Sequence, residues 1–380
     1  MPVRNRLIVL IVALSWAFLC AAPAGACDVP VFRYALERWE PDVYGVLVFH
    51  DGPLAEDGKK AVDLLKKAAA DRDVPCNMDV LVVDVSAKMA PYVAEVWKMQ
   101  KDKPLPRIVV CYPRRMGGVF VGWAGALTLD NAKAITHSPA RTEIYQRIIK
   151  GDVAVWVLLE SGDKVKDDAA AKLLQETLKK LEGELELPVP APALYADDDQ
   201  DDSPAGPPLK VAFSVVRVSR KAAAERFLVD LLLHTEEDLT KEYASEPMTF
   251  AFFGQGRAMW ALVGKGINAG NVAEVCAFLV DRCSCQVKQM NPGIDVLFAA
   301  DWYAGFEDSE GIASPLPSVV AAAGAPGAAA QAVEVPPVVE TPASVAGRGV
   351  LVRNTLIALG CVVLAAAGLT VWLARRTSRV

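Results

Sequence analysis

The fold is decided by the stretch Leu105-Pro-Arg-Ile-Val-Val-Cys-Tyr112 and the segment after it, Gly118-Val-Phe-Val-Gly-Trp-Ala-Gly-Ala-Leu127, because the pattern returns later in the chain. The later copies are Glu246-Pro-Met-Thr-Phe-Ala-Phe-Phe253 and Arg257-Ala-Met-Trp-Ala-Leu-Val-Gly-Lys-Gly266. Each copy is a proline, an apolar strand, a turn and a second strand. Pro106 precedes Asn131 by 25 positions, and Pro247 precedes Asn271 by 24. A duplicated hairpin-and-helix unit is therefore predicted; two unrelated hairpins, each followed by a helix, are the alternative.

The same order of elements surrounds both stretches: strand, helix, strand, helix, two strands and a helix. In the first half we expect strands at 44–49, 79–85, 107–112 and 119–123, with helices at 30–39, 56–70, from 91, and over 129–150 with a restart at Ser138-Pro139. In the second half we expect strands at 153–159, 210–218, 249–253 and 257–263, with helices at 166–186, 222–234 and 271–280.

This order resembles the thioredoxin fold, twice, over residues 40–150 and 151–285. The fold class implied by the resemblance is α/β, with two tandem thioredoxin-like domains, each a central mixed β-sheet flanked by helices. In that family the proline before the third strand has a cis peptide bond and lies beside the active-site loop. Pro106 and Pro247 match that position, so the resemblance implies cis bonds at Leu105-Pro106 and Glu246-Pro247.

The chain departs from the family where its enzymes carry Cys-x-x-Cys, at the start of the helix after the first strand. The two halves read His50-Asp-Gly-Pro-Leu54 and Glu160-Ser-Gly-Asp-Lys164 there, without sulfur. Thioredoxin-type exchange at that place is excluded, and what remains resembles the non-catalytic domains that bind proteins. His50, Asp51, Pro106 and Pro247 are then the candidate binding residues, and a plain surface turn is the simpler interpretation of His50 and Asp51.

Cys283-Ser-Cys285 is the one close cysteine pair outside the two ends of the chain. It fits a thiol redox pair or a soft-metal site for copper, and a disulfide from one of them to a distant cysteine is the simpler interpretation. Cys111 and Cys276 lie in apolar contexts and are expected in the core. The three histidines show no ligand spacing, so we expect no metal and no cofactor.

Both ends of the chain carry targeting patterns. Residues 1–26 are a basic, then apolar, then small-residue run, as in a signal peptide, which makes Cys27 the first mature residue. A cysteine at that place also suggests a lipoprotein, but Ala24 stands where a lipoprotein signal usually has leucine. An uncharged run ending at Ala374 fits a transmembrane helix over 350–374, and the arginines of the tail, 375–380, place that tail in the cytoplasm.

Two segments cannot build a core: the acidic, proline-rich insertion 188–208 and the Ala/Pro-rich stalk 306–349. They leave two domains, 27–150 and 151–305. The net charge of −6 argues against nucleic acid as a partner. We therefore expect a membrane-anchored extracytoplasmic binding or scaffold protein, not an enzyme, whose partner is another envelope protein. The alternative is a thiol-disulfide or copper-handling protein that uses Cys283 and Cys285.

Overall fold

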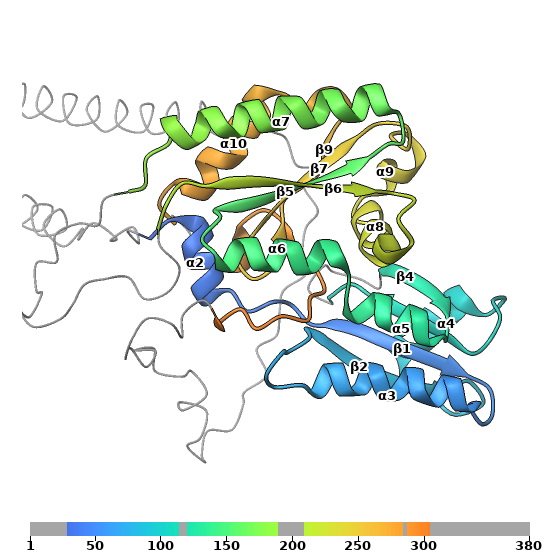
Figure 1. Ribbon diagram of the computed structural model, residues 1–380. Helices are drawn as coiled ribbons and strands as arrows, with labels where there is room; N and C mark the ends of the chain where they lie inside the picture. Colours follow the sequence, from blue (N-terminus) through green and yellow to red (C-terminus); the bar gives the residue numbers. More distant parts are fainter. Residues whose placement is uncertain (1–28, 114–119, 189–208, 284–286, 305–380) are drawn as a thin grey trace, which may run out of the picture. The chain divides into compact units, whose positions relative to one another are not determined.

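The computed structural model describes residues 29–113, 120–188, 209–283 and 287–304, which form two mixed β-sheets flanked by helices (Figure 1). The predicted signal peptide, the acidic insertion from residue 189, the stalk, the transmembrane helix and the tail lie outside these residues. Among the helices that are described, none has the length and apolar character needed to cross a membrane. The domain boundaries expected from the sequence stay predictions.

The first sheet has the strand order β2-β1-β3-β4. Its strands are β1 (Tyr44–His50), β2 (Met78–Asp84), β3 (Arg107–Cys111) and β4 (Val121–Ala126). β1 runs parallel to β2 and antiparallel to β3, and β3 and β4 form the expected antiparallel hairpin. Every residue of β3 is buried, as its apolar sequence predicts.

The second sheet repeats this plan. Its strands are β5 (Ala154–Glu160), β6 (Phe213–Ser219), β7 (Met248–Phe253), β8 (Arg257–Ala258), β9 (Leu262–Val263) and β10 (Ile294–Asp295). β5 is parallel to β6 and antiparallel to β7, which pairs with β8 and β9. The expected strand 257–263 is thus two short strands, separated by residues 259–261.

The registers of the two sheets match residue by residue. Phe49 pairs with Arg107 across β1 and β3, and Leu159 pairs with Met248 across β5 and β7. Pro106 precedes Arg107, so it lies opposite His50. Pro247 precedes Met248, so it lies opposite Glu160. The strands agree in order and direction, as a duplication requires.

Two asparagines make the same bonds in the two halves. Asn131 donates its backbone N–H to the Thr128 hydroxyl and its side chain to the Ala126 carbonyl, 2.8 Å away. Asn271 donates its backbone N–H to Asn268 and its side chain to the Gly266 carbonyl, 2.9 Å away. Both bonds tie the first turn of a closing helix to the end of the hairpin before it.

Helices cover both faces of each sheet. On the first sheet, α3 (Glu56–Ala70) and α5 (Leu129–Thr136) pack on one face and α4 (Pro91–Gln100) packs on the other. On the second sheet, α7 (Lys164–Glu184) and α10 (Ala269–Val280) pack on one face, and α6 (Pro139–Ile149) and α8 (Arg226–Leu233) on the other. The short helices are α9 (Glu237–Lys241), η2 (Ala223–Glu225), η3 (Gly264–Gly266) and η4 (Lys288–Met290). One buried cluster contains side chains from both sheets.

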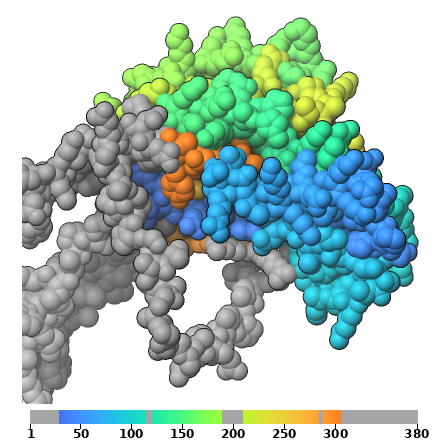
Figure 2. All heavy atoms as spheres, turned by 60° about the horizontal axis from the view of Figure 1, so that its bottom comes forward, coloured from blue at the N-terminus to red at the C-terminus, as the bar shows by residue number. Residues whose placement is uncertain are grey.

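Each end of the described chain packs against the half of the protein to which it does not belong in sequence, an arrangement that we call the crossing of the chain ends. Helix α2 (Val31–Arg38) precedes the first sheet but packs against α10 and β7 of the second half, and the Val31 N–H donates to the Asp281 carbonyl. Residues 296–300 follow the second sheet but bond to the start of β2, where the Phe298 N–H donates to the Asn77 side chain. In Figure 2 the orange C-terminal residues lie against blue atoms of the first half.

A buried cluster of charged side chains joins the segment before β1 to β8, η4 and β10. The Asp295 carboxylate lies 2.9 Å from an Nη of Arg257 and 2.5 Å from Nζ of Lys288, which also contacts Asp42 at 2.9 Å. The Asp42 N–H donates to Asp295 as well. Arg257, Lys288 and Asp295 are all at most 7% exposed, so their charges are compensated within the protein.

One expectation about the prolines is confirmed and one is wrong. Leu105-Pro106 is cis, whereas Glu246-Pro247 is not among the cis bonds of the described chain. The trans isomer is the intrinsically preferred one. Next to the trans bond of Pro247, the Glu246 carbonyl accepts a hydrogen bond from Nη2 of Arg220 at 2.6 Å.

Candidate functional site

Each sheet brings its loop and its proline together at one end. We call residues 50–54 with 105–107 the first site, and residues 160–164 with 246–247 the second site. The register of β1 and β3 places His50 opposite Pro106, and that of β5 and β7 places Glu160 opposite Pro247. The first-site candidates His50, Asp51 and Pro106 are thus neighbours, and Pro247 belongs to the other sheet.

The first site is open at its surface. Asp51 and Pro106 are exposed, and Leu105 is half-buried. Within the described chain the backbone N–H and C=O of Leu105 have no hydrogen-bond partner. The loop turns at Gly52, which has a φ of 71°, and no side chain caps the start of α3. Backbone groups that are exposed and unpaired can bind an added extended chain.

His50 has one ring nitrogen engaged. Its Nδ1 lies 2.7 Å from the Gly52 carbonyl. A carbonyl only accepts, so Nδ1 carries the proton of this hydrogen bond. Beside it, the hydrogen bonds from Ser86, with a smaller effect of His50, lower the pKa of Asp84. The site therefore presents an imidazole ring and one carboxylate.

Arg107 adds a cation that the sequence analysis missed. It directly follows Pro106 and is 8% exposed. Among the described residues the Arg107 side chain makes one weak hydrogen bond, from Nη1 to the Pro104 carbonyl at 3.5 Å. Its Nε is buried without a partner there. Burial lowers its pKa. A guanidinium has five donors, and most of those of Arg107 have no acceptor among the described residues.

The second site is filled by its own side chains. Asp167, 3% exposed, accepts hydrogen bonds from the N–H and hydroxyl of Ser161 and from the Gly162 N–H, at 2.8, 2.8 and 3.0 Å. Asp163 caps α7 through the Val165 N–H. The backbone donors of this loop are therefore satisfied internally. Asp167 is thus a buried carboxylate in a helix that is otherwise rich in exposed charges.

The residue before Pro247 is also engaged on both sides. The Glu246 N–H donates to the Tyr243 carbonyl at 3.0 Å, and its carbonyl accepts from Arg220. The Glu246 carboxylate lies 2.5 Å from Nζ of Lys166, and this hydrogen bond raises the pKa of Lys166. Pro247 itself is buried. The two sites therefore share a framework but differ in what they leave unpaired.

The predicted pair of Cys283 and Cys285 is described only in part. Cys283 is 1% exposed, its N–H donates to the Val29 carbonyl, and Cys285 lies outside the described residues. The expected core positions of Cys111 and Cys276 are confirmed. Among the described residues no group of three or more His, Cys, Asp or Glu side chains is placed to hold a metal.

Cys76 and Cys276 should resist alkylation in the native protein. Burial raises the pKa of each thiol to about 12, so at pH 8 only about one thiol in ten thousand is a thiolate. Iodoacetamide labelling of the full chain at pH 8, followed by peptide mass spectrometry, should find both unmodified. The same treatment in guanidinium should label both. Rapid labelling of either in the native protein would contradict their burial.

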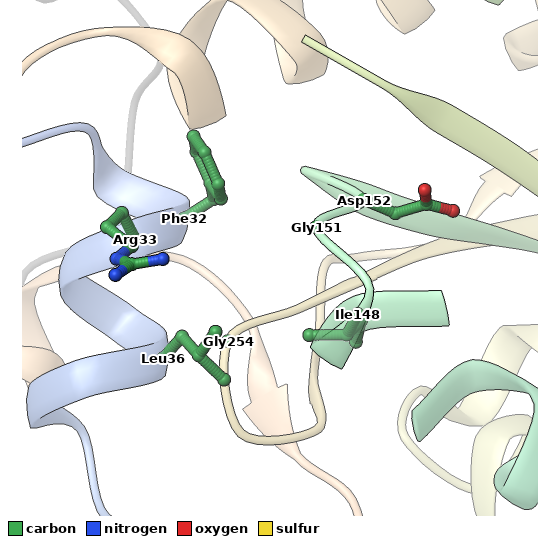
Figure 3. Close-up of a pocket in the computed structure, with 7 residues that line it drawn as sticks. All are labelled: Phe32, Arg33, Leu36, Ile148, Gly151, Asp152 and Gly254. Atoms are coloured by element: carbon green, nitrogen blue, oxygen red, sulfur yellow. The ribbon is translucent and has the colours of Figure 1, made fainter. Parts of the chain in front are cut away.

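A small cavity lies away from both sites, between α2, the end of α6 and the turn at Gly254 (Figure 3). It encloses about 250 Å³, part of it open to solvent, and its lining residues are Phe32, Arg33, Leu36, Ile148, Gly151, Asp152 and Gly254. The charged side chains have partners, since Arg33 bonds Glu37 and Asp152 accepts from Ser214 at 2.6 Å. The cavity is a packing defect between α2 and the second sheet.

Comparisons with known proteins add little beyond this geometry. No protein-family model matches the chain, and no curated protein matches it. A solved structure of the first two thioredoxin domains of Eps1p from Naumovozyma dairenensis is 11% identical, over 68% of this chain and 98% of that one, with a TM-score of 0.21. That score is too low to carry an argument. What the structure establishes is an α/β chain with two mixed sheets flanked by helices, consistent with thioredoxin-like domains.

Proposed function

We propose that this chain is a membrane-anchored extracytoplasmic binding or scaffold protein with two thioredoxin-like domains that do no thiol chemistry. The basic start and the uncharged C-terminal run of the sequence support export and anchoring. The loops His50-Asp-Gly-Pro-Leu54 and Glu160-Ser-Gly-Asp-Lys164 support a role without redox exchange, because neither contains sulfur.

The observation that carries the proposal is the difference between Leu105 and Glu246. Both precede the proline of their site, yet the Leu105 backbone is unpaired within the described chain and the Glu246 backbone is bonded on both sides. We assign binding to the first site for this reason. The second site then serves as a support that keeps its own polar groups satisfied.

The chemistry of the first site indicates what its partner supplies. Leu105 offers one backbone donor and one acceptor, which suit an extended peptide segment. Arg107 needs acceptors, and a carboxylate or a carbonyl of the partner would meet that need. The partner is accordingly another envelope protein that presents an extended, acidic or carbonyl-rich segment.

Site-specific photocrosslinking in membranes tests this assignment. A photoreactive residue in place of exposed Asp51 should capture a partner several times more strongly than one in place of exposed Lys164, because only the first site binds. Arg107→Met should weaken the capture at Asp51, and the matched surface change Arg217→Met should not. Equal capture at the two positions, or capture at Lys164 alone, would rule out the first site as the binding site.

A further inference from the structure

Strand β2 borders the first sheet, and no strand of the described chain pairs with its outer side (Figure 1). The Asn77 carbonyl accepts from the Tyr44 N–H, and the Val85 N–H donates to the His50 carbonyl, both at 2.9 Å. The odd-numbered residues of this strand therefore turn their backbone groups toward β1. Because direction alternates along a strand, Val80 and Val82 turn their N–H and C=O groups outward.

We propose that a second copy of this chain adds its own β2 at this border, antiparallel, with the two-fold axis at Leu81. In that register Val80 lies opposite Val82 of the second copy, and the two residues exchange both backbone hydrogen bonds. Leu81 lies opposite its own equivalent in a non-hydrogen-bonded pair, where side chains approach most closely. The two four-stranded sheets then form one continuous sheet, and the contact is isologous, as a two-fold axis requires.

The sequence Met78-Asp-Val-Leu-Val-Val-Asp84 suits pairing with itself. Opposite each other stand valine and valine, leucine and leucine, Asp79 and Val83, and Met78 and Asp84. No two like charges face each other, which directly opposed carboxylates would penalise. Leu81 is 48% exposed although it is a large apolar residue, and pairing would bury it.

Neighbouring registers are less favourable. A shift by one residue places the outward N–H and C=O groups of one copy opposite backbone groups of the second copy that already bond to that copy's own β1. A register that pairs Val80 with itself sets Val82 opposite Met78, whose N–H already donates to the Cys76 carbonyl. A register that pairs Val82 with itself sets Val80 opposite Asp84, whose carbonyl already accepts from Ala87. The axis at Leu81 is the arrangement in which both valines meet unengaged groups.

Cysteine crosslinking of the full chain in membranes tests the register. Leu81→Cys should form a covalent dimer through residue 81 of both copies, because about 4.5 Å between the Cα atoms permits a disulfide. Asp79→Cys alone and Val83→Cys alone should not, whereas a mixture of these two chains should link position 79 to position 83. Peptide mass spectrometry separates these links from those of the native cysteines. Absence of the link at 81, or equal yields from all single variants, would overturn the proposal.

Sedimentation of the detergent-solubilised chain gives an independent measurement. The chain should show a concentration-dependent dimer, and Leu81→Lys should raise its dissociation constant about tenfold or more, because two cations would meet on the axis. Val43→Lys is the matched control, since Val43 is 50% exposed and lies outside β2. A monomer at every concentration, or crosslinking of position 81 to a different protein, would show that this strand does not receive a second copy.

Discussion

Replacing Asp295 with alanine should destabilise the protein by about 3–5 kcal/mol, because Arg257 and Lys288 would stay buried without their shared carboxylate. The desolvation of both cations is offset in the native protein by the Asp295 carboxylate, by Asp42 at Lys288 and by neighbouring carbonyls. Urea unfolding, followed by circular dichroism, measures the change. The loss of the carboxylate should also loosen β10 from β8, since the cluster joins these strands to Asp42.

The control is an ion pair at the surface. Arg217 contacts Glu160 and Asp168 but is 40% exposed, so Arg217→Ala should cost no more than about 1 kcal/mol. Replacing its three most buried charges by apolar residues, Asp295→Leu with Arg257→Met and Lys288→Met, should cost less than Asp295→Ala alone, because the carboxylate that stays, Asp42, is partly exposed. A cost for Asp295→Ala as small as that for Arg217→Ala would show that the cluster is solvated.

The same substitution, glycine to alanine, should have opposite effects at two positions. Gly254 has a φ of 56°, and a Cβ there would lie 2.7 Å from the Cβ of Ala35 and 3.1 Å from its backbone carbon. Gly254→Ala should therefore cost about 2–4 kcal/mol, from left-handed backbone strain and from displacement of α2. Gly183 lies in α7, and a Cβ there meets nothing within 4 Å. Gly183→Ala should stabilise by about 0.5–1 kcal/mol.

Thermal unfolding of the two variants beside the parent chain decides this. Because the chemical change is identical, the difference between the variants reports on backbone conformation and space alone. If Gly254→Ala were as stable as the parent, α2 would not pack on the turn of the second sheet as described.

Much of the framework was predictable because it depends on local patterns. The alternation of apolar strands and helices, the cap at Ser138 and the repeated asparagine follow from short-range sequence. The crossing of the chain ends was not predictable, since α2 has an apolar face but nothing in its sequence says which sheet the face meets. The trans bond before Pro247 is the intrinsically preferred isomer, and the presence of a proline does not by itself say which isomer a fold selects.

The site was predictable in position and not in character. The absence of sulfur and the neighbourhood of His50 and Pro106 followed from the resemblance and the register. The buried Asp167 and Arg107, whose Nε has no partner among the described residues, were missed. A lone aspartate in a charged helix and a lone arginine at a strand start carry no distinctive pattern. Their roles emerge from which donors and acceptors the fold leaves without partners.

The crossing of the chain ends bears on how the protein can be completed during synthesis. The N–H groups of Asn77 and Ala300, and the carbonyls of Phe298 and Pro75, bond one another across more than two hundred residues. Domains usually fold in order as they leave the ribosome. Here the start of β2 bonds to residues near 300, and α2 packs on β7 and α10, so neither half can be completed before residue 300 has been synthesised.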